Sequence, residues 1–504
     1  MKRVLVVGCP GAGKSTFARK LREKTGLPLH YLDMLWWKPD KSHVPRDEFD
    51  AKLKDIVAGD EWIIDGNYSR TLAMRMERAD TVFMLDFPLD ICLAGAKSRV
   101  GTNRVDLPWV EDEFDSIELA NWIVDFPKQE LPKVYQLVAE YGKGKDIHIF
   151  HTRAEADAYI ENLDRQLSIC VDMYGCPNRC KHCWLGHMPN RKMEDGADEF
   201  VANYFSPYFD KIDFYSWLRE PDFTDDYRAR WQKDVELSKN AKPERFELAS
   251  FWRIVRDKDY IPFLKEVGVK KVQLTFFGLK DTQDRYIGRK GAYEEALKAT
   301  DLLIDAGIIP RWQCFINEEN KGEIVELYRL AMEIKNTKCK EFEFFVHEGT
   351  CDGENRKLYP IRINKGDIPS DLAPVFLNYD GLLTEREICE MWKDDTSHPD
   401  FDLSGDLVFY VSNTYDVYYN FTNMTDEWIA GNLKKDKPEE LVPRLLAGDT
   451  YALNKAKEVT LKELVERYGD FSSDKVFDLD DYKIYLFNNY LKDAKELSYG
   501  NERN

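Results

Sequence analysis

The sequence has no apolar run of about 18 residues, which excludes a hydropathy-defined transmembrane helix, and the apolar stretch after "MKR" is only about five residues long, too short for a signal-peptide core. Basic residues are also in deficit, because 72 Lys and Arg stand against 91 Asp and Glu, giving a formal net charge of −19. Binding to nucleic acid depends on clustered Lys and Arg. We therefore expect no nucleic-acid and no membrane partner, and a small molecule or a peptide as substrate.

The ten cysteines are not spread as in a disulfide scaffold. Four of them fall between positions 170 and 183 of a 504-residue chain. Such clustering favours reduced, metal-binding or catalytic thiols, and a reducing cytoplasm as the location. The length itself predicts roughly two to four domains.

Strand and helix patterns alternate over residues 1–163. Apolar strand candidates lie at 2–7, 29–33, 61–65, 81–86 and 146–150, with helical patterns such as 13–24 and 47–58 between them. Alternation of this kind predicts a parallel sheet covered on both faces, that is, a three-layer α/β/α sandwich.

A second alternating series fills residues 164–350. Its expected strands are 167–173, 212–218, 245–251, 271–277, 309–317 and 341–348, and its expected helices lie near 198–211, 227–241, 260–267, 293–306 and 321–335. Six such β/α units predict a partial (β/α)6 TIM-like barrel with its chemistry at the carboxyl ends of the strands. Residues 351–504 are expected to form a small α+β cap, beginning with a loop over 351–374 and including a hairpin at 406–421 that turns at Asn413-Thr414.

Residues Gly8 to Ser15, "GCPGAGKS", match G-x-x-x-x-G-K-S/T between an apolar strand and an amphipathic helix. In this context glycines let backbone N–H groups surround phosphates, Lys14 reaches the β- and γ-phosphates, and Ser15 reaches Mg²⁺. The candidate residues for ATP or GTP are Gly8, Gly11, Gly13, Lys14, Ser15 and Thr16, with Ser15 also the candidate Mg²⁺ ligand.

Together with "LDMLWWKP", "WIIDGNYS", "ADTVFMLDFP" and "ANWIVDFPK", this motif resembles the small adenylate-kinase-like P-loop proteins called topology modulation proteins. The resemblance covers residues 1–163 and implies catalytic roles near the phosphate acceptor and the metal for Lys14, Asp33 and Asp65. Asp86 is a candidate Walker B-like carboxylate, and the candidates for neutralising a transferring phosphoryl group are Arg70, Arg75, Arg99 and Arg104. A strand-end Asp is equally suited to capping a helix.

The segment "YGCPNRCKHCWLGH" places Cys176, Cys180 and Cys183 in a loop after the first barrel strand. Two interpretations compete. In a structural zinc site, His182 or His187 completes a Cys3His tetrahedron. In an iron–sulfur site, the three thiolates hold three irons of a 4Fe-4S cluster and leave the fourth iron open.

C-x3-C-x2-C after strand one of a six-unit β/α series resembles the radical S-adenosylmethionine (SAM) superfamily. The resemblance implies that Cys176, Cys180 and Cys183 hold a 4Fe-4S cluster whose open iron binds SAM. It further implies reductive cleavage of SAM, abstraction of hydrogen from a substrate, and an external electron donor such as ferredoxin or flavodoxin. His182, just before the last cysteine, takes the place of the family's aromatic-type residue beside the cofactor.

Other positions agree with this resemblance in part. The family's Gly-Gly-Glu-Pro motif stands here as "LREP", residues 218–221, so that Glu220 remains as the candidate acceptor for the SAM ammonium group and both glycines are absent. Ser250 lies at the end of strand three and Arg253 just after it, where the family contacts the ribose or carboxylate. His347 and Glu348, at the end of strand six, are predicted to face substrate or, equally, to have a structural role.

Residues 406–436 resemble the hairpin and "GNL" signature of the auxiliary domain found in peptide-modifying radical enzymes, without its cluster-binding cysteines. The sequence therefore leaves two classes of function open for the whole chain. In one, a radical enzyme is fused to a kinase domain that phosphorylates a small-molecule or nucleotide substrate of the same pathway. In the other, the P-loop domain is a nucleotide switch that transfers no phosphate.

Overall fold

The computed structural model describes residues 1–501 except 111–116, 164, 184, 187, 246–248, 352 and 421–423. Two compact units make up the chain. The first comprises residues 1–166, 203–211 and 437–446, and the second comprises residues 167–202, 212–436 and 447–504. The predicted division into domains at residues 163 and 350 stays a prediction.

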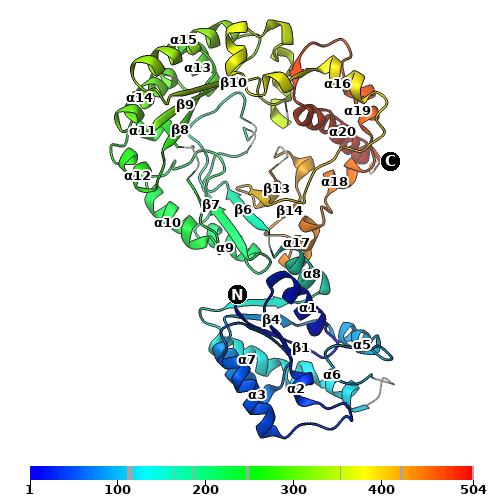
Figure 1. The fold of residues 1–504 in the computed structure, drawn as a ribbon. Helices are drawn as coiled ribbons and strands as arrows, with labels where there is room; N and C mark the ends of the chain where they lie inside the picture. The colour runs from blue at the N-terminus through cyan, green and yellow to red at the C-terminus, as the bar shows by residue number, and fades with distance from the viewer. Residues whose placement is uncertain are drawn as a thin grey trace. The chain divides into compact units, whose positions relative to one another are not determined.

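The first unit is built on one parallel sheet with the strand order β2-β3-β1-β4-β5 (Figure 1). Its strands are β1 (Arg3–Gly8), β2 (Leu29–Tyr31), β3 (Trp62–Asp65), β4 (Thr81–Leu85) and β5 (Asp146–Phe150). All five strands predicted for residues 1–163 are confirmed. The three inner strands β1, β3 and β4 are buried almost throughout, as is usual for parallel strands, whereas the edge strands β2 and β5 are only partly buried.

The two faces of this sheet bury alternate residues of β1. Val4 and Val6 pack into one core, and Leu5 and Val7 pack into the other. The helices of the unit are α1 (Lys14–Thr25), α2 (Leu32–Trp36), α3 (Arg46–Ala58), α4 (Ser69–Arg78), α5 (Leu89–Lys97), α6 (Ile117–Gln129), α7 (Leu131–Tyr141), α8 (Arg153–Asn162) and α17 (Pro438–Leu446). Because β1 is the central strand, with β3 on one side and β4 on the other, the loop after it lies at a topological switch point, where α/β sheets bind ligands.

The second unit contains two larger sheets. One has the order β10-β9-β8 and is parallel, and the other has the order β14-β13-β12-β6-β7. The strands are β6 (Gln166–Val171), β7 (Lys211–Tyr215), β8 (Lys271–Phe276), β9 (Ile309–Phe315), β10 (Glu343–His347), β12 (Leu407–Val411), β13 (Asp416–Tyr419) and β14 (Gly431–Asn432). Of the third predicted strand, 245–251, residues 246–248 lie outside the described part of the chain. The α/β sandwich and the barrel-like β/α series confirm the predicted fold class.

Helices follow the strands of this unit and lie along the outside of the curved arrangement in Figure 1. They are α9 (Ala197–Phe205), α10 (Tyr227–Leu237), α11 (Phe251–Ile254), α12 (Tyr260–Glu266), α13 (Lys280–Ile287), α14 (Ala292–Asp305) and α15 (Lys321–Thr337). Further along the chain come β11 (Leu383–Thr384), α16 (Glu385–Trp392), α18 (Tyr451–Ala456), α19 (Leu461–Tyr468), β15 (Val476–Phe477) and α20 (Leu479–Asn501). Where the sequence predicts a loop after residue 350, short 3-10 helices occupy much of 353–381.

The predicted C-terminal hairpin is present as β12 and β13, but it is part of the barrel sheet. β12 pairs in parallel with β6, with Leu407 opposite Leu167 and Val411 opposite Val171. Without β12 this edge of β6 would present unpaired backbone groups. The C-terminal segment therefore completes the sheet from which the cysteine loop emerges.

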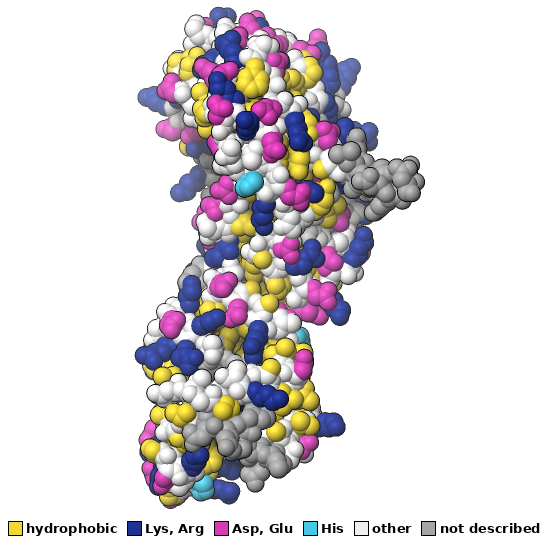
Figure 2. Space-filling view, turned by 90° about the vertical axis from the view of Figure 1, so that its right-hand side faces the viewer, with side chains coloured by type: hydrophobic (Ala, Val, Ile, Leu, Met, Phe, Trp, Pro, Cys, Tyr) yellow, Lys and Arg dark blue, Asp and Glu magenta, His cyan; other side chains and the backbone are white. Residues whose placement is uncertain are grey.

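None of the described helices is long and apolar enough to cross a membrane. On the face drawn in Figure 2, Lys and Arg side chains are interspersed with Asp and Glu side chains. Charges of both signs are therefore mixed on this face.

Candidate functional site

The P-loop forms the floor of a cavity of about 660 Å³ in the first unit. Gly13 is left-handed (φ 96°) directly before α1 begins at Lys14. Gly11 (φ 84°) lies so close to α5 that an added Cβ would be 2.0 Å from the Cys92 carbonyl oxygen. All the predicted nucleotide-binding residues except Gly8 line this cavity, namely Gly11, Gly13, Lys14, Ser15 and Thr16.

Gly8 instead anchors the start of the P-loop through hydrogen bonds to Asn67. Its N–H donates to Asn67 Oδ1 (3.0 Å), and its carbonyl accepts from Asn67 Nδ2 (2.7 Å). Asn67 is buried and was not singled out from the sequence, although its position two residues after the third strand is a signal that could have found it. It fixes the start of the P-loop relative to β3.

Asp65 lies beside the two polar residues of the motif. Ser15 Oγ donates to Asp65 Oδ2 (2.5 Å), and Lys14 Nζ donates to the Cys9 carbonyl (3.2 Å). Burial raises the pKa of Asp65 to about 6, against the lowering effects of Lys14 and Ser15. Its Oδ1 is shielded from solvent and has no hydrogen-bond partner among the described residues. The geometry therefore offers a carboxylate and a hydroxyl together, the oxygen ligands that Mg²⁺ prefers.

Asp33 is a second carboxylate close enough to Lys14 for that residue to act on its pKa. Tyr68 donates its hydroxyl proton to Asp33 Oδ1 (2.8 Å), and burial raises the pKa of Asp33 while Tyr68 and Lys14 lower it. Asp106, which forms an ion pair with Arg104, also acts on the pKa of Asp33. Sequence reasoning missed Asp106, because it considered this segment only as a source of arginines.

The four candidate arginines separate into two pairs. Arg99 and Arg104 line the cavity with Lys14. Arg70 is instead held in an exposed ion pair with Asp50, and Arg75 is fully buried, where its Nη1 donates to the Gly66 carbonyl (2.8 Å). Another candidate, Asp86, accepts a hydrogen bond from Tyr135 (2.7 Å).

The cysteine loop follows β6 and is fastened to the end of α13. Arg179 N–H donates to the Ile287 carbonyl (3.0 Å), and Lys181 N–H donates to the Tyr286 carbonyl (2.8 Å). Gly288, which is left-handed (φ 71°), ends this helix, and a Cβ there would be 2.7 Å from the Arg179 carbonyl oxygen. The central part of the loop is therefore held by backbone contacts.

The three thiols share one partly buried neighbourhood. Burial is the largest cause raising the pKa of each, to about 12 for Cys180, and Cys176 is raised further by Glu220 and by the other two cysteines. Within the described residues, no three or more His, Cys, Asp or Glu side chains are arranged to hold a metal ion. The ligand set thus stays a prediction. Because buried thiols with raised pKa values become thiolates mainly when a metal binds, the donor chemistry fits an iron–sulfur cluster.

Glu220 lies against the first of these cysteines, with Oε2 3.9 Å from Cys176 Sγ. Burial raises its pKa to about 7, whereas Ser250 lowers it. Its Oε1 is shielded from solvent and unpaired within the described part of the chain. An enclosed acceptor of this kind fits an ammonium group, and the predicted contact of Glu220 with SAM stays a prediction.

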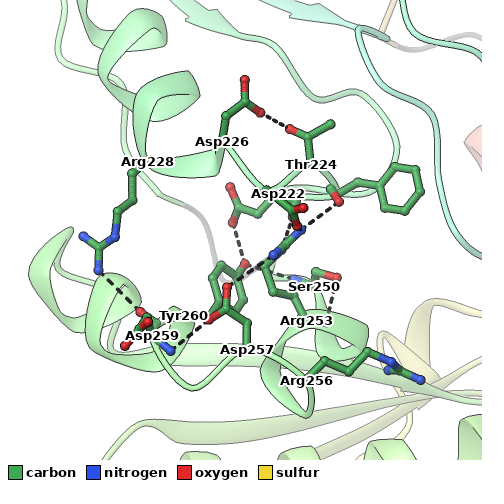
Figure 3. Close-up of polar contacts among 12 residues, drawn as sticks. Asp222, Thr224, Asp226, Arg228, Ser250, Arg253, Arg256, Asp257, Asp259 and Tyr260 are labelled. Carbon is green, nitrogen blue, oxygen red and sulfur yellow. Dashed lines mark hydrogen bonds and ion pairs between the residues drawn. The ribbon is translucent and has the colours of Figure 1, made fainter.

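Ser250 and Arg253 belong to a polar network behind the "LREP" segment (Figure 3). Ser250 Oγ accepts from Arg253 N–H (3.3 Å) and caps α11. The Arg253 guanidinium group is buried and donates to the carbonyls of Asp222 (2.7 Å) and Phe223 (2.9 Å). These contacts hold the backbone that follows Glu220, and the predicted contacts of Ser250 and Arg253 with SAM stay predictions.

His182 is enclosed by aromatic rings, with centroids 4.2 Å from Phe277 and 4.9 Å from Phe315. Burial lowers the pKa of His182 to about 3, so the ring is neutral at pH 7. The His347 ring also contacts Phe315, at a tilt, with ring centroids 4.2 Å apart. Glu348 forms an ion pair with the buried Arg362 (3.6 Å), in agreement with the structural alternative for this residue. His187 lies outside the described residues.

The family model described as the Radical SAM superfamily matches residues 171–331. This segment is a radical SAM domain. It begins at the last residue of β6 and includes the three cysteines and Glu220, which agrees with the predicted resemblance. A curated relative, the Fe-coproporphyrin III synthase of Methanosarcina barkeri, is 32% identical over 79 residues. That match spans 16% of this chain and about a fifth (20%) of the relative.

Solved structures resemble both parts of the chain. The anSMEcpe structure with bound AdoMet and the Cp18Cys peptide is 15% identical, and the match covers 67% of this chain and all of that one (100%) at a TM-score of 0.36. Streptococcus suis SuiB bound to the precursor peptide SuiA is 11% identical, with 68% and 79% covered and a TM-score of 0.33. Shikimate kinase from Bacteroides thetaiotaomicron is 17% identical, with 32% and 95% covered and a TM-score of 0.23. These TM-scores are low, and we conclude nothing from them about what the radical SAM domain acts on.

Proposed function

We propose that the chain is a radical SAM enzyme that holds a 4Fe-4S cluster with Cys176, Cys180 and Cys183. The observation that carries this proposal is the C-x3-C-x2-C loop directly after β6 in the family-matched segment. The unpaired carboxylate oxygen of Glu220 supports it, because that oxygen lies in the same neighbourhood as the thiols.

When bound, the cluster would supply the electron for reductive cleavage of SAM, after which hydrogen is abstracted from a substrate. The protein's own contribution is placement and exclusion of water. Glu220 would accept from the ammonium group of SAM, and the aromatic rings around His182 would keep one side of the site apolar. The substrate is a small molecule or a peptide, and the electron comes from a separate donor such as ferredoxin or flavodoxin.

A second activity is favoured by the cavity of the first unit. We propose that it binds ATP or GTP with Mg²⁺, because the P-loop backbone, Lys14, Arg99 and Arg104 surround a space of about 660 Å³. Phosphoryl transfer would use Asp33 or Asp65 near the acceptor. A nucleotide switch without transfer remains the alternative.

Anaerobic reconstitution with iron and sulfide, followed by reduction with SAM present, tests the radical activity. We expect a 4Fe-4S spectrum and formation of 5′-deoxyadenosine. Cys180→Ala should lose both, whereas the matched variant Cys339→Ala, whose cysteine lies outside the loop, should keep them. Stoichiometric zinc with neither signal in the wild-type protein would refute the proposal.

Turnover of ATP and GTP with a panel of nucleosides and small alcohols tests the second activity. Acceptor-stimulated turnover that is lost in Lys14→Ala supports a kinase. Tight binding of nucleotide without transfer supports a switch. Absence of nucleotide binding at millimolar concentration would contradict both.

A further inference from the structure

Arg219 stands where the radical SAM motif has its second glycine, and its side chain has a definite task. The guanidinium group forms a two-point ion pair with Asp172, with Nε 2.8 Å from Oδ1 and Nη2 2.7 Å from Oδ2. The Asp172 side chain is 1% exposed and the Arg219 side chain 8% exposed. This pair joins the residue after β6 to the residue before Glu220.

The C-terminal hairpin reaches the same pair. Asn413, in the turn between β12 and β13, donates from Nδ2 to Asp172 Oδ2 (3.1 Å) and to the Pro189 carbonyl (2.6 Å). Both partners are acceptors only, which fixes the orientation of the amide group. Asn413 is 3% exposed, so these bonds are made away from water.

The Pro189 carbonyl belongs to the segment of the loop that follows the three cysteines. Arg219 Nη2 also donates to it (3.0 Å), and on the same segment Arg191 Nη2 donates to the Asn413 carbonyl (3.1 Å). We call the group of Asp172, Arg219, Asn413 and the Pro189 carbonyl the latch. It contains one negative charge, one positive charge and an amide, and every described contact within it pairs a donor with an acceptor.

The latch acts on the first cluster cysteine through the next residue. Asn190 Oδ1 accepts from Cys176 N–H (2.9 Å), and Asn190 Nδ2 donates to the Cys176 carbonyl (2.9 Å). Gly175 (φ 83°) permits this approach, because a Cβ there would be 2.0 Å from Asn190 Oδ1. Both backbone groups of Cys176 are therefore held by a side chain adjacent to the latch.

We infer that Arg219 and Asn413 are positioning residues for the cluster-binding loop, which they anchor to β6 and to the C-terminal hairpin so that Cys176 is held in place before the cluster binds. The role of the loop as a cluster site rests on the proposed function. The contacts of the latch do not rest on it. In this chain a side chain that closes the loop takes the place of the motif's glycine.

Hydrogen exchange of the cluster-free protein tests the latch independently of any cluster. In Arg219→Gln and Asn413→Ala, amides of residues 173–191 should exchange roughly 10- to 100-fold faster, as expected when a buried charge-assisted hydrogen bond is lost. Arg228→Gln is the matched control, because Arg228 forms an exposed ion pair with Glu266 (2.6 Å) and should leave exchange in this loop unchanged. Unchanged exchange in both latch variants would overturn the inference.

The reconstituted protein gives the second readout. Arg219→Lys keeps the positive charge but lacks the two-point hydrogen-bonding geometry of the guanidinium group. Its rate of iron release to a chelator should therefore lie between the rates of wild type and Arg219→Gln. In the double variant Arg219→Gln/Asn413→Ala, the rate of iron release should increase by less than the combined effects of the two single variants. The reason is that both residues act through the same hydrogen-bonded group. Additive effects, or iron release like wild type alongside faster exchange, would show that the latch does not position the cluster. If the wild-type protein holds no cluster, the proposed function fails while the exchange result still decides the latch.

Discussion

Helix α5 packs against the P-loop at a close contact between Gly95 and Gly11. Replacing Gly95 by alanine tests whether this contact shapes the phosphate site. Gly95 has ordinary helical backbone geometry, so at an exposed position alanine would stabilise the helix by roughly 0.5–1 kcal/mol. Here the new Cβ would be 2.1 Å from the Gly11 carbonyl oxygen and 2.7 Å from Arg153 Nη2. Real Cβ contacts essentially never fall below 3.0 Å, so loop or helix must move.

The required movement is about an ångström, and overpacking of this kind costs about 1–3 kcal/mol. Since the gain in helix propensity offsets part of that cost, we expect the first unit to lose about 1–2 kcal/mol of stability. Displacing the phosphate-binding backbone by about an ångström should weaken Mg-ATP binding by tenfold or more.

Calorimetric titration with Mg-ATP and thermal unfolding measure the two effects. The control is Gly322→Ala in α15, where an added Cβ meets nothing within 4 Å, so this variant should be as stable as wild type or slightly more stable. If Gly95→Ala also raises the melting temperature and keeps its affinity for ATP, α5 does not support the loop and the reasoning is wrong.

Three further changes have definite expected outcomes. Ser15→Ala should weaken binding of Mg-ATP but not of ATP measured in EDTA, because only the former uses the hydroxyl group as a metal ligand. Burial raises the pKa of Asp234 to about 8, above about 3.9 in an unfolded chain, so stability should fall as pH rises between these values. Urea unfolding of Asp234→Asn should show less of this fall, and a wild-type protein more stable at pH 8 than at pH 5 would contradict it. Tyr260→Phe should lower the free energy of unfolding by about 1–3 kcal/mol. The reason is that the Tyr260 hydroxyl donates to Asp222 (2.5 Å) and accepts from Ser250 N–H (3.2 Å). An unchanged urea midpoint in this variant would contradict that role.

Local patterns in the sequence were enough to predict the strands of the first unit and, in the second, the helices α9, α10, α12, α14 and α15. The apolar run "RVLVVG" forms the buried strand β1 and ends at a glycine. The P-loop motif that follows predicts that the next helix begins at Lys14, as it does. The candidate nucleotide residues follow from the same motif, because its chemistry depends on residues adjacent in sequence.

Contacts between distant segments were not predictable in this way. Asn413 and Asp172 are 241 positions apart, and no periodicity links them. Arg219 could be recognised as a departure from the family's glycine, but its partner could not. The effect of Asp106 on the pKa of Asp33 is likewise an interaction between segments that are distant in the sequence.

The pairing of β6 with β12 has a consequence for the order of events during synthesis. The strand that precedes the cysteine loop finds one of its sheet neighbours only after the ribosome has made Leu407 to Val411, when most of the chain has already emerged. The first unit's sheet, by contrast, is complete once Phe150 has been made. Pairing across so long a separation is slow compared with local structure. A cluster inserted earlier would bind a loop that lacks its final support, so we expect cluster insertion to follow the synthesis of β12.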